Sequence, residues 1–141
     1  MADKPITATV RETKESPFSV EVLVDGHKIK SDEPIDSGGG NLAPNPHEIL
    51  VAALGACTAQ TVRWYAQRHD WPLESVEVDV GYKHDHLEGH SGLLDIFTKT
   101  VHLTGASLTP EQRTRLLDIA GKCPIQRLME GMPVIRTADV T

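Results

Sequence analysis

Apolar and polar positions alternate through the first third of the chain. Two runs with a period of two residues occur there, at residues 6–10 and 18–24, and this period is typical of half-buried strands. Asp25 and Gly26 follow the second run and precede another short run at residues 27–30. An Asp-Gly pair in this position predicts a hairpin turn leading into a third strand.

A change of pattern predicts a loop followed by one long helix. Residues 31–46 contain three consecutive glycines and three prolines, which indicates a loop. Asn45, Pro46 and Glu48 then have the spacing of a cap, a first helical position and a capping-box carboxylate. Residues 49–57 are apolar around the whole circumference, so we expect this part of a central helix of about 23 residues to be buried on all sides, whereas the C-terminal end of the helix reaches solvent. A chain this small would struggle to cover such a helix, which indicates a homodimer.

The second half of the chain repeats both kinds of pattern. Alternating runs predict strands around residues 76–82 and 97–103, separated by a polar loop at residues 84–92. Capping-box spacing from Thr109 to Gln112 predicts a helix to about Ala120. Cys123 and Pro124 indicate a further short helix to Glu130, and residues 133–140 a last strand. The order predicts a single α+β domain, residues 1–141, with mainly antiparallel pairing.

Composition narrows the class of protein. The 141 residues carry 14 Lys and Arg against 20 Asp and Glu, for a net charge of -6, and no basic block interrupts them. Nucleic acid is therefore not an expected partner. No run approaches the roughly 20 apolar residues of a membrane helix, and residues 1–5 lack the apolar stretch of a secretory signal. We expect a cytoplasmic protein that does not enter the membrane.

The candidate chemistry lies in two cysteines, Cys57 and Cys123. Two are too few for a disulfide scaffold or a four-thiolate zinc site. Cys123 stands at a predicted helix start, where free N–H groups favour a thiolate, and Lys122 and Arg127 lie close in sequence; the alternative is a thiol that only caps or packs. Cys57 lies about three turns into an apolar helix, where burial raises a thiol pKa. Without a cation from elsewhere in the fold, it would be a core cysteine.

The surroundings of both cysteines resemble one known family. Residues 45–59, Asn-Pro-His-Glu-Ile-Leu-Val-Ala-Ala-Leu-Gly-Ala-Cys-Thr-Ala, resemble the osmotically inducible protein C (OsmC) and organic hydroperoxide resistance family. So do the loop at residues 38–44 and the segment Lys-Cys-Pro-Ile at residues 122–125, which places the two cysteines 66 positions apart. The resemblance covers essentially the whole chain. It implies an OsmC-like fold, with antiparallel sheets around a long buried central helix, in an intertwined homodimer.

The resemblance also implies an activity. In that family the helix cysteine, matched by Cys57, attacks an organic hydroperoxide, releases an alcohol and becomes a sulfenic acid. The second cysteine, matched by Cys123, condenses with it to a disulfide, which an external dithiol reductant then reduces. The implied function is therefore a thiol-dependent peroxidase that needs no cofactor.

Some positions of this chain depart from the family pattern. The family's Glu lies ten residues before the helix cysteine, where this chain has His47, followed by Glu48. Nine residues of helix place Glu48 and Cys57 on opposite faces, roughly 13 Å apart along the axis. Glu48 is therefore either a catalytic group that acts through the partner subunit or a loop, or a helix cap. The family's activating arginine has Arg11 and Arg127 as candidates, neither at a motif position.

Two other interpretations remain open. A non-catalytic relative would be a dimer that binds an apolar ligand or senses oxidants. A metal site could use His84, His86 and His90, although their polar, glycine-containing segment indicates a solvated loop. The glycines at residues 38–40 are not followed by Lys-Ser or Lys-Thr, so we expect them to allow close backbone approach and not to bind phosphate.

Overall fold

A computed structural model describes residues 4–140. Residues 1–3 and residue 141 lie outside the described residues, so the expectation about a secretory signal at residues 1–5 falls partly outside them. The chain divides into two compact units, Met1–Leu50 and Val51–Thr141, and the boundary falls inside the first long helix, α1 (Pro46–Arg68). The predicted α+β class is confirmed, with two antiparallel sheets and three α-helices among the described residues.

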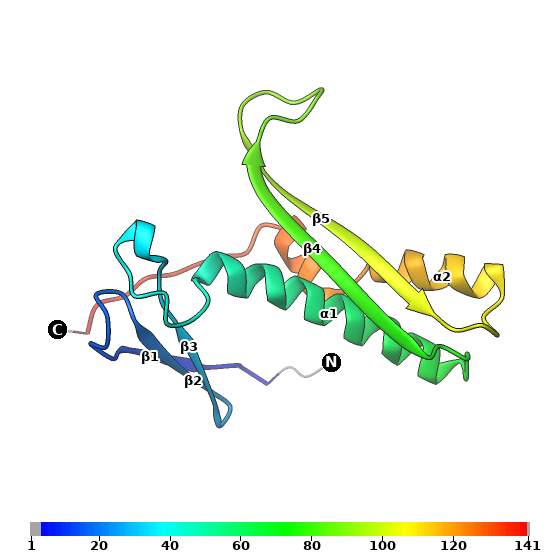
Figure 1. Ribbon diagram of the computed structural model, residues 1–141, viewed down its shortest axis with the longest axis horizontal. Helices are drawn as coiled ribbons and strands as arrows, with labels where there is room; N and C mark the ends of the chain where they lie inside the picture. Colours follow the sequence, from blue (N-terminus) through cyan, green and yellow to red (C-terminus); the bar gives the residue numbers. More distant parts are fainter. Residues whose placement is uncertain (1–3, 141) are drawn as a thin grey trace. The chain divides into compact units, whose positions relative to one another are not determined.

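The first unit contains a three-stranded sheet, β1 (Ala8–Glu12), β2 (Val20–Val24) and β3 (His27–Ser31), paired in that order (Figure 1). Asp25 and Gly26 both have positive φ angles, 47° and 78°. Two such residues define the tight hairpin turn that the sequence predicted. The first two strands each begin two residues later than predicted, whereas β3 starts where expected.

The segment after β3 is organised by a buried carboxylate. Asp32 is 1% exposed. It accepts hydrogen bonds from the Ser16 hydroxyl (2.7 Å) and from the backbone N–H groups of Glu33 (2.7 Å), Gly40 (3.2 Å) and Leu42 (3.1 Å). These bonds close the loop that contains a short 3₁₀-helix, η1 (Ile35–Ser37).

The glycine cluster does what its composition predicted. A Cβ atom on Gly39 would lie 2.1 Å from the backbone oxygen of Glu33, inside any permitted contact. Only a residue without a side chain allows the two backbones to approach this closely. The expected close approach is therefore confirmed.

Helix α1 has the predicted length but a narrower buried face. Its buried side chains follow one stripe at intervals of four residues: Leu54, Thr58, Val62 and Ala66. The apolar side chains of Ala52, Ala53 and Ala56, all within residues 49–57, are exposed. The difference from the expected all-round burial arises because a single chain covers only one side of this helix. Among residues 4–140, no helix is long and apolar enough to cross a membrane.

The second unit packs α1 and a second helix, α2 (Pro110–Ala120), with a long hairpin of β4 (Ser75–Asp85) and β5 (Leu94–Thr104) (Figure 1). Thr109 and Gln112 form the predicted capping box at the start of α2. A short helix, α3 (Pro124–Glu130), follows with Cys123 as its N-cap, also as predicted. The core is formed by Val62, Ala66, Leu73, Leu108, Leu116 and Ala120.

The predicted C-terminal strand is wrong. Residues 133–140 form no strand among the described residues. Val134 and Ile135 are 81% and 86% exposed. An apolar pattern makes a strand only when another backbone exchanges hydrogen bonds with it, and these residues form no such ladder in the described chain.

Candidate functional site

The second unit brings the two cysteines together. Cys57 lies on α1 and Cys123 caps α3, and both are free thiols. Cys123 is fully buried, at 0% exposure, whereas Cys57 is half-buried. The Cys57 side chain lies close enough to Cys123 to lower the pKa of the Cys123 thiol. Two residues far apart in the sequence thus form one dithiol.

Cys123 receives further hydrogen bonds from two elements. Its Sγ atom accepts from the backbone N–H of Gln126 at 3.4 Å, as expected for an N-cap side chain. The Thr58 hydroxyl on α1 lies 3.5 Å from the same sulfur and donates to it. Donors that converge on a sulfur favour its ionised form.

A lysine on β5 completes the arrangement. Lys99 Nζ donates to Thr58 Oγ1 at 2.9 Å and to the backbone oxygen of Ala120 at 2.6 Å. The Ala120 carbonyl ends α2, where unpaired carbonyl groups attract a cation. A half-buried positive charge is therefore held one hydrogen bond away from the Thr58–Cys123 contact.

These contacts decide the ionisation of Cys123. Burial alone raises the pKa of this thiol. The hydrogen bonds from Thr58, from the Gln126 N–H and from Cys57, together with the Lys99 charge, outweigh burial and hold the pKa below its ordinary value. The resulting site is a buried, ionisable thiol with a more accessible thiol nearby.

The cations nearest to Cys123 in sequence are not among the groups that lower the pKa of its thiol. Lys122 Nζ bonds to Asp118 at 3.1 Å, and Arg127 is exposed. Arg11 is exposed on β1. The charge that acts on Cys123 comes from Lys99, which belongs to no predicted motif. A signal was present, since Lys99 occupies the inward face of β5 beside Phe97 and Val101, where an apolar side chain is the rule.

Glu48 takes one of its two predicted positions. Its Oε1 atom accepts from the Asn45 backbone N–H at 3.0 Å, and the Asn45 side chain accepts from the Glu48 N–H at 2.9 Å. This reciprocal pair is a capping box, which satisfies two backbone donors at the start of α1.

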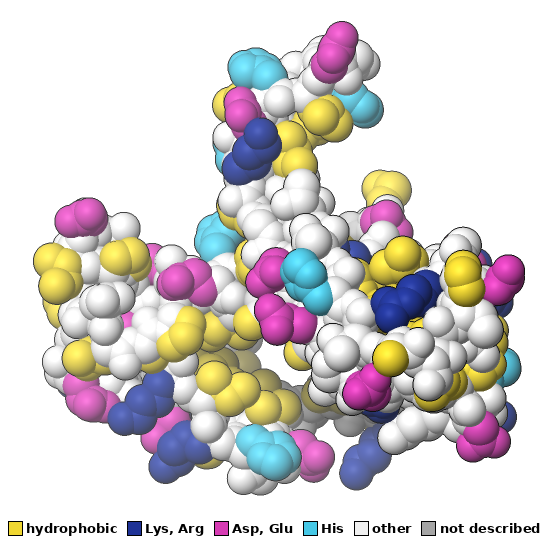
Figure 2. Space-filling view, turned by 45° about the vertical axis from the view of Figure 1, so that its right-hand side comes forward, with side chains coloured by type: hydrophobic (Ala, Val, Ile, Leu, Met, Phe, Trp, Pro, Cys, Tyr) yellow, Lys and Arg dark blue, Asp and Glu magenta, His cyan; other side chains and the backbone are white. Residues whose placement is uncertain are grey.

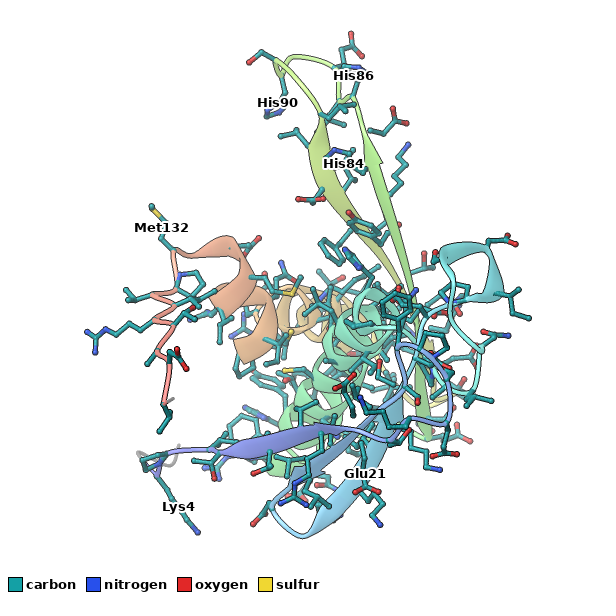
Figure 3. All side chains as sticks on the ribbon, turned by 90° about the vertical axis from the view of Figure 1, so that its left-hand side faces the viewer. Lys4, Glu21, His84, His86, His90 and Met132 are labelled. Atoms are coloured by element: carbon teal, nitrogen blue, oxygen red, sulfur yellow. The ribbon has the colours of Figure 1, made fainter. Side chains whose placement is uncertain are left out.

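The histidines proposed as metal ligands lie at the outer end of the β4–β5 hairpin (Figure 3). His84 pairs with Asp95 at 3.1 Å, and the labelled side chains of His86 and His90 lie further out on the connecting loop. Figure 2 shows acidic and histidine side chains at this exposed end. They do not form a cluster of potential ligands in the described chain. The group that does is exposed on the hairpin face: Glu77, Asp79 and His102.

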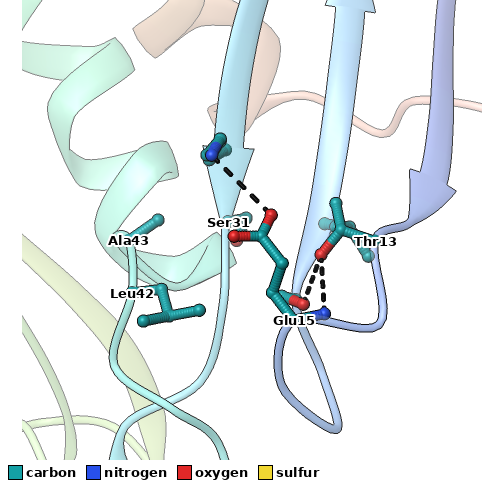
Figure 4. Close-up of a pocket in the computed structure, with 8 residues that line it drawn as sticks. Thr13, Glu15, Ser31, Leu42 and Ala43 are labelled. Carbon is teal, nitrogen blue, oxygen red and sulfur yellow. Dashed lines mark hydrogen bonds and ion pairs between the residues drawn. The ribbon is translucent and has the colours of Figure 1, made fainter.

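A pocket of about 240 Å³ opens within the first unit (Figure 4). Glu15 and Lys30 at its wall form an ion pair at 3.7 Å, and the hydroxyl groups of Thr13 and Ser19 lie 2.5 Å apart. These polar groups pair with one another, so the pocket presents little chemistry toward a ligand.

The fold and the paired cysteines define a class of small α+β dithiol protein, and comparisons with known proteins identify its family. The model of the OsmC-like protein family matches residues 38–138, so the chain belongs to this family. A comparison with curated proteins found no match.

Solved structures have the same fold. An organic hydroperoxide resistance protein OsmC from Legionella pneumophila is 21% identical, with a TM-score of 0.67 and 93% of each chain covered. An OsmC-like protein from Mycoplasma pneumoniae is 19% identical, with a TM-score of 0.68, covering 92% of this chain and 90% of the other. The organic hydroperoxide resistance protein OhrB of Bacillus subtilis is 19% identical, with a TM-score of 0.59 and coverage of 92% and 93%.

Proposed function

We propose that this protein is a cytoplasmic, thiol-dependent peroxidase that reduces organic hydroperoxides. The observation that carries the proposal is that Cys57 lies close enough to Cys123 to lower the pKa of its thiol, while the other groups around Cys123 also favour the thiolate. Family membership adds support, because several of the solved structures are named as organic hydroperoxide resistance proteins.

The proposed reaction divides into three steps. The Cys57 sulfur attacks the distal oxygen of the hydroperoxide; the O–O bond breaks, Cys57 becomes a sulfenic acid, and the alkoxide leaves as an alcohol after taking the thiol proton. The Cys123 thiolate then attacks the Cys57 sulfur; the S–S bond forms, and the S–O bond breaks to release water after protonation. An external dithiol reduces the disulfide and is itself oxidised.

The exposure of the two thiols supports this division of roles. Cys57 is half-buried, so a peroxide can reach it, whereas Cys123 is fully buried. Ala53 and Ala56, next to Cys57 on α1, expose apolar side chains. Such a surface favours a hydroperoxide with a hydrocarbon group over hydrogen peroxide.

The exposed apolar side of α1 also supports a homodimer. Ala52, Ala53, Ala56 and Trp64 form surface that a second copy of the chain would remove from water. Glu48 enters the proposal as the cap that fixes the start of α1, through its hydrogen bonds with Asn45.

The direct test compares the wild type with two single-thiol variants. With dithiothreitol present, we expect the wild type to consume cumene hydroperoxide over many turnovers and to form one Cys57–Cys123 disulfide per chain when the reductant is withheld. Cys57→Ser should abolish consumption. Cys123→Ser should still form the Cys57 sulfenic acid but no intramolecular disulfide. Unchanged consumption by Cys57→Ser would overturn the proposal.

The alternative, a non-catalytic dimer that senses oxidants, shares the dithiol but not the turnover. The lack of an arginine at a family motif position favours it. It requires that hydroperoxide oxidise the thiols once, without sustained consumption when dithiol is present. The steady-state rate in the same assay therefore separates the two functions.

A further inference from the structure

We propose that Lys99 and Thr58 are positioning residues that favour the thiolate form of Cys123, the form that attacks the oxidised Cys57. Lys99 bonds to Thr58, and Thr58 bonds to the Cys123 sulfur, so the three side chains form a continuous path from β5 through α1 to α3. The effect of Lys99 and Thr58 on the ionisation of Cys123 can be measured in the reduced protein, whether or not the protein is a peroxidase. The effect on disulfide formation rests on the proposed peroxidase function.

The hydroxyl of Thr58 has one proton to donate, and two acceptors lie within reach. The backbone oxygen of Leu54 is 2.8 Å away and the Cys123 sulfur 3.5 Å away. Lys99 donates a hydrogen bond to the oxygen of this hydroxyl, and this bond occupies one of the two lone pairs of the oxygen. The ammonium group polarises the hydroxyl and strengthens its donation. When Cys123 is ionised, the negative sulfur is the stronger acceptor and draws the proton away from Leu54.

Lys99 is held in place independently of Cys123. Its second bond, 2.6 Å to the Ala120 carbonyl, ties the ammonium to the end of α2. This bond is what a purely structural lysine would make, so it does not by itself argue for a role at the thiol. The bond to Thr58 does, because Thr58 is fully buried and contacts Cys123 directly.

Each element packed around Cys123 contributes an identifiable group. On α1 these are the Cys57 thiol and the Thr58 hydroxyl, on β5 the Lys99 ammonium, and on α3 the Gln126 N–H. Lys122, next to Cys123 in sequence, pairs instead with Asp118. In the described part of the chain, Lys99 is the charged group that acts on this sulfur.

The consequence falls on the second step of the proposed reaction. Thiolate, not thiol, attacks a sulfenic acid, so the rate follows the ionised fraction of Cys123. For a thiol whose pKa lies above the ambient pH, a further rise of the pKa by 1 lowers the ionised fraction about tenfold. The same rise increases the intrinsic nucleophilicity of the thiolate. With a Brønsted coefficient of about 0.4–0.5, the net loss of rate is roughly threefold.

The test follows the ultraviolet absorbance of the thiolate during a pH titration and so measures the ionisation of Cys123. All variants carry Cys57→Ser, so that Cys123 is the one thiol present. The absorbance of a variant that lacks both cysteines is subtracted. Lys99→Met should move the titration midpoint to higher pH, and Lys99→Arg should move it part of the way back. Thr58→Val, which keeps the shape but removes the hydroxyl, should act like Lys99→Met, whereas Thr58→Ser should not. The matched control is Lys122→Met, which should leave the midpoint unchanged.

An unchanged midpoint in Thr58→Val would overturn the inference, and so would an unchanged midpoint in a folded Lys99→Met protein. If Lys99→Met does not fold, Thr58→Val decides alone, since it leaves the Lys99–Ala120 bond intact. In chains with both cysteines, Lys99→Met should prolong the life of the Cys57 sulfenic acid, trapped with dimedone, by about threefold for a midpoint that is higher by one pH unit. If the wild type forms no sulfenic acid, the peroxidase proposal fails, while the titration still decides the role of Lys99.

Discussion

The hydroxyl of Thr58 lies 3.5 Å from the sulfur of Cys123, although 65 residues separate them in the chain. This contact places the ionisable thiol, Cys123, in the interior and leaves the neighbouring Cys57 half-buried at its edge. Cys123 therefore has a thiol that ionises easily but is inaccessible, and Cys57 is the more accessible of the two.

Access alone decides reaction with a bulky reagent. We expect a maleimide attached to a large group to label Cys57 in the folded protein well before Cys123, because Cys123 has no exposed surface. The measurement is mass spectrometry of labelled peptides over time, with Cys57→Ser and Cys123→Ser as single-thiol controls. Equal labelling of both variants under native conditions would contradict this expectation; in urea, both should label.

Variants of Glu48 and of its partner Asn45 test whether Glu48 is a helix cap or a catalytic group. Asn45→Ala removes an N-cap acceptor and should lower the free energy of unfolding by about 1 kcal/mol. Glu48→Gln keeps a side-chain oxygen that can accept from the Asn45 N–H, so hydroperoxide consumption should match the wild type. Both are measured by urea unfolding and by the peroxidase assay. Loss of turnover in Glu48→Gln at unchanged stability would assign Glu48 a catalytic role.

The buried carboxylate of Asp32 should make the stability of the protein depend on pH. Burial raises the pKa of this group, but the hydrogen bonds from Ser16 and from three backbone N–H groups outweigh it and hold the pKa below its ordinary value. Because the unfolded chain has the ordinary value of about 3.9, the stabilisation is complete above that pH and is lost as pH falls through the folded pKa.

Asp32→Asn tests this directly. The variant should unfold at lower urea concentration near neutral pH, and its difference from the wild type should shrink as pH falls through the acid range. Asp36→Asn, on the exposed η1 segment, is the matched control and should change little. A penalty for Asp32→Asn that does not vary with pH would refute the electrostatic explanation.

Two adjacent leucines on α2 test the position of the core. Leu116 is 0% exposed and belongs to the core cluster, whereas Leu117 is 49% exposed. Leu116→Ala should cost about 3–5 kcal/mol of unfolding free energy because it removes buried surface and leaves a cavity. Leu117→Ala should cost about 0.5 kcal/mol or less. Similar losses for the two variants, measured by urea unfolding, would place the core elsewhere.

Much of the fold follows from local patterns in the sequence. Alternation located β2 and the β4–β5 hairpin, and the Asp25-Gly26 pair located a turn whose two residues have positive φ. Capping signals located the starts of α1, α2 and α3, because each depends on a side chain within four residues of the helix end. The predicted strand at residues 133–140 failed because a strand requires a distant backbone, which its own sequence does not provide.

The sequence by itself determined the helices that carry the two cysteines, the position of each cysteine on its helix, and the α+β class. These features depend on short-range periodicity and helix caps. The tertiary structure decided that Lys99, and not the adjacent Lys122, supplies the charge near Cys123. It also decided that only one stripe of α1 is buried within the single chain. The physical reason is the same in both cases. Charge interaction and burial depend on distance in space, and the residues responsible come from β5, α1 and α3, far apart along the chain.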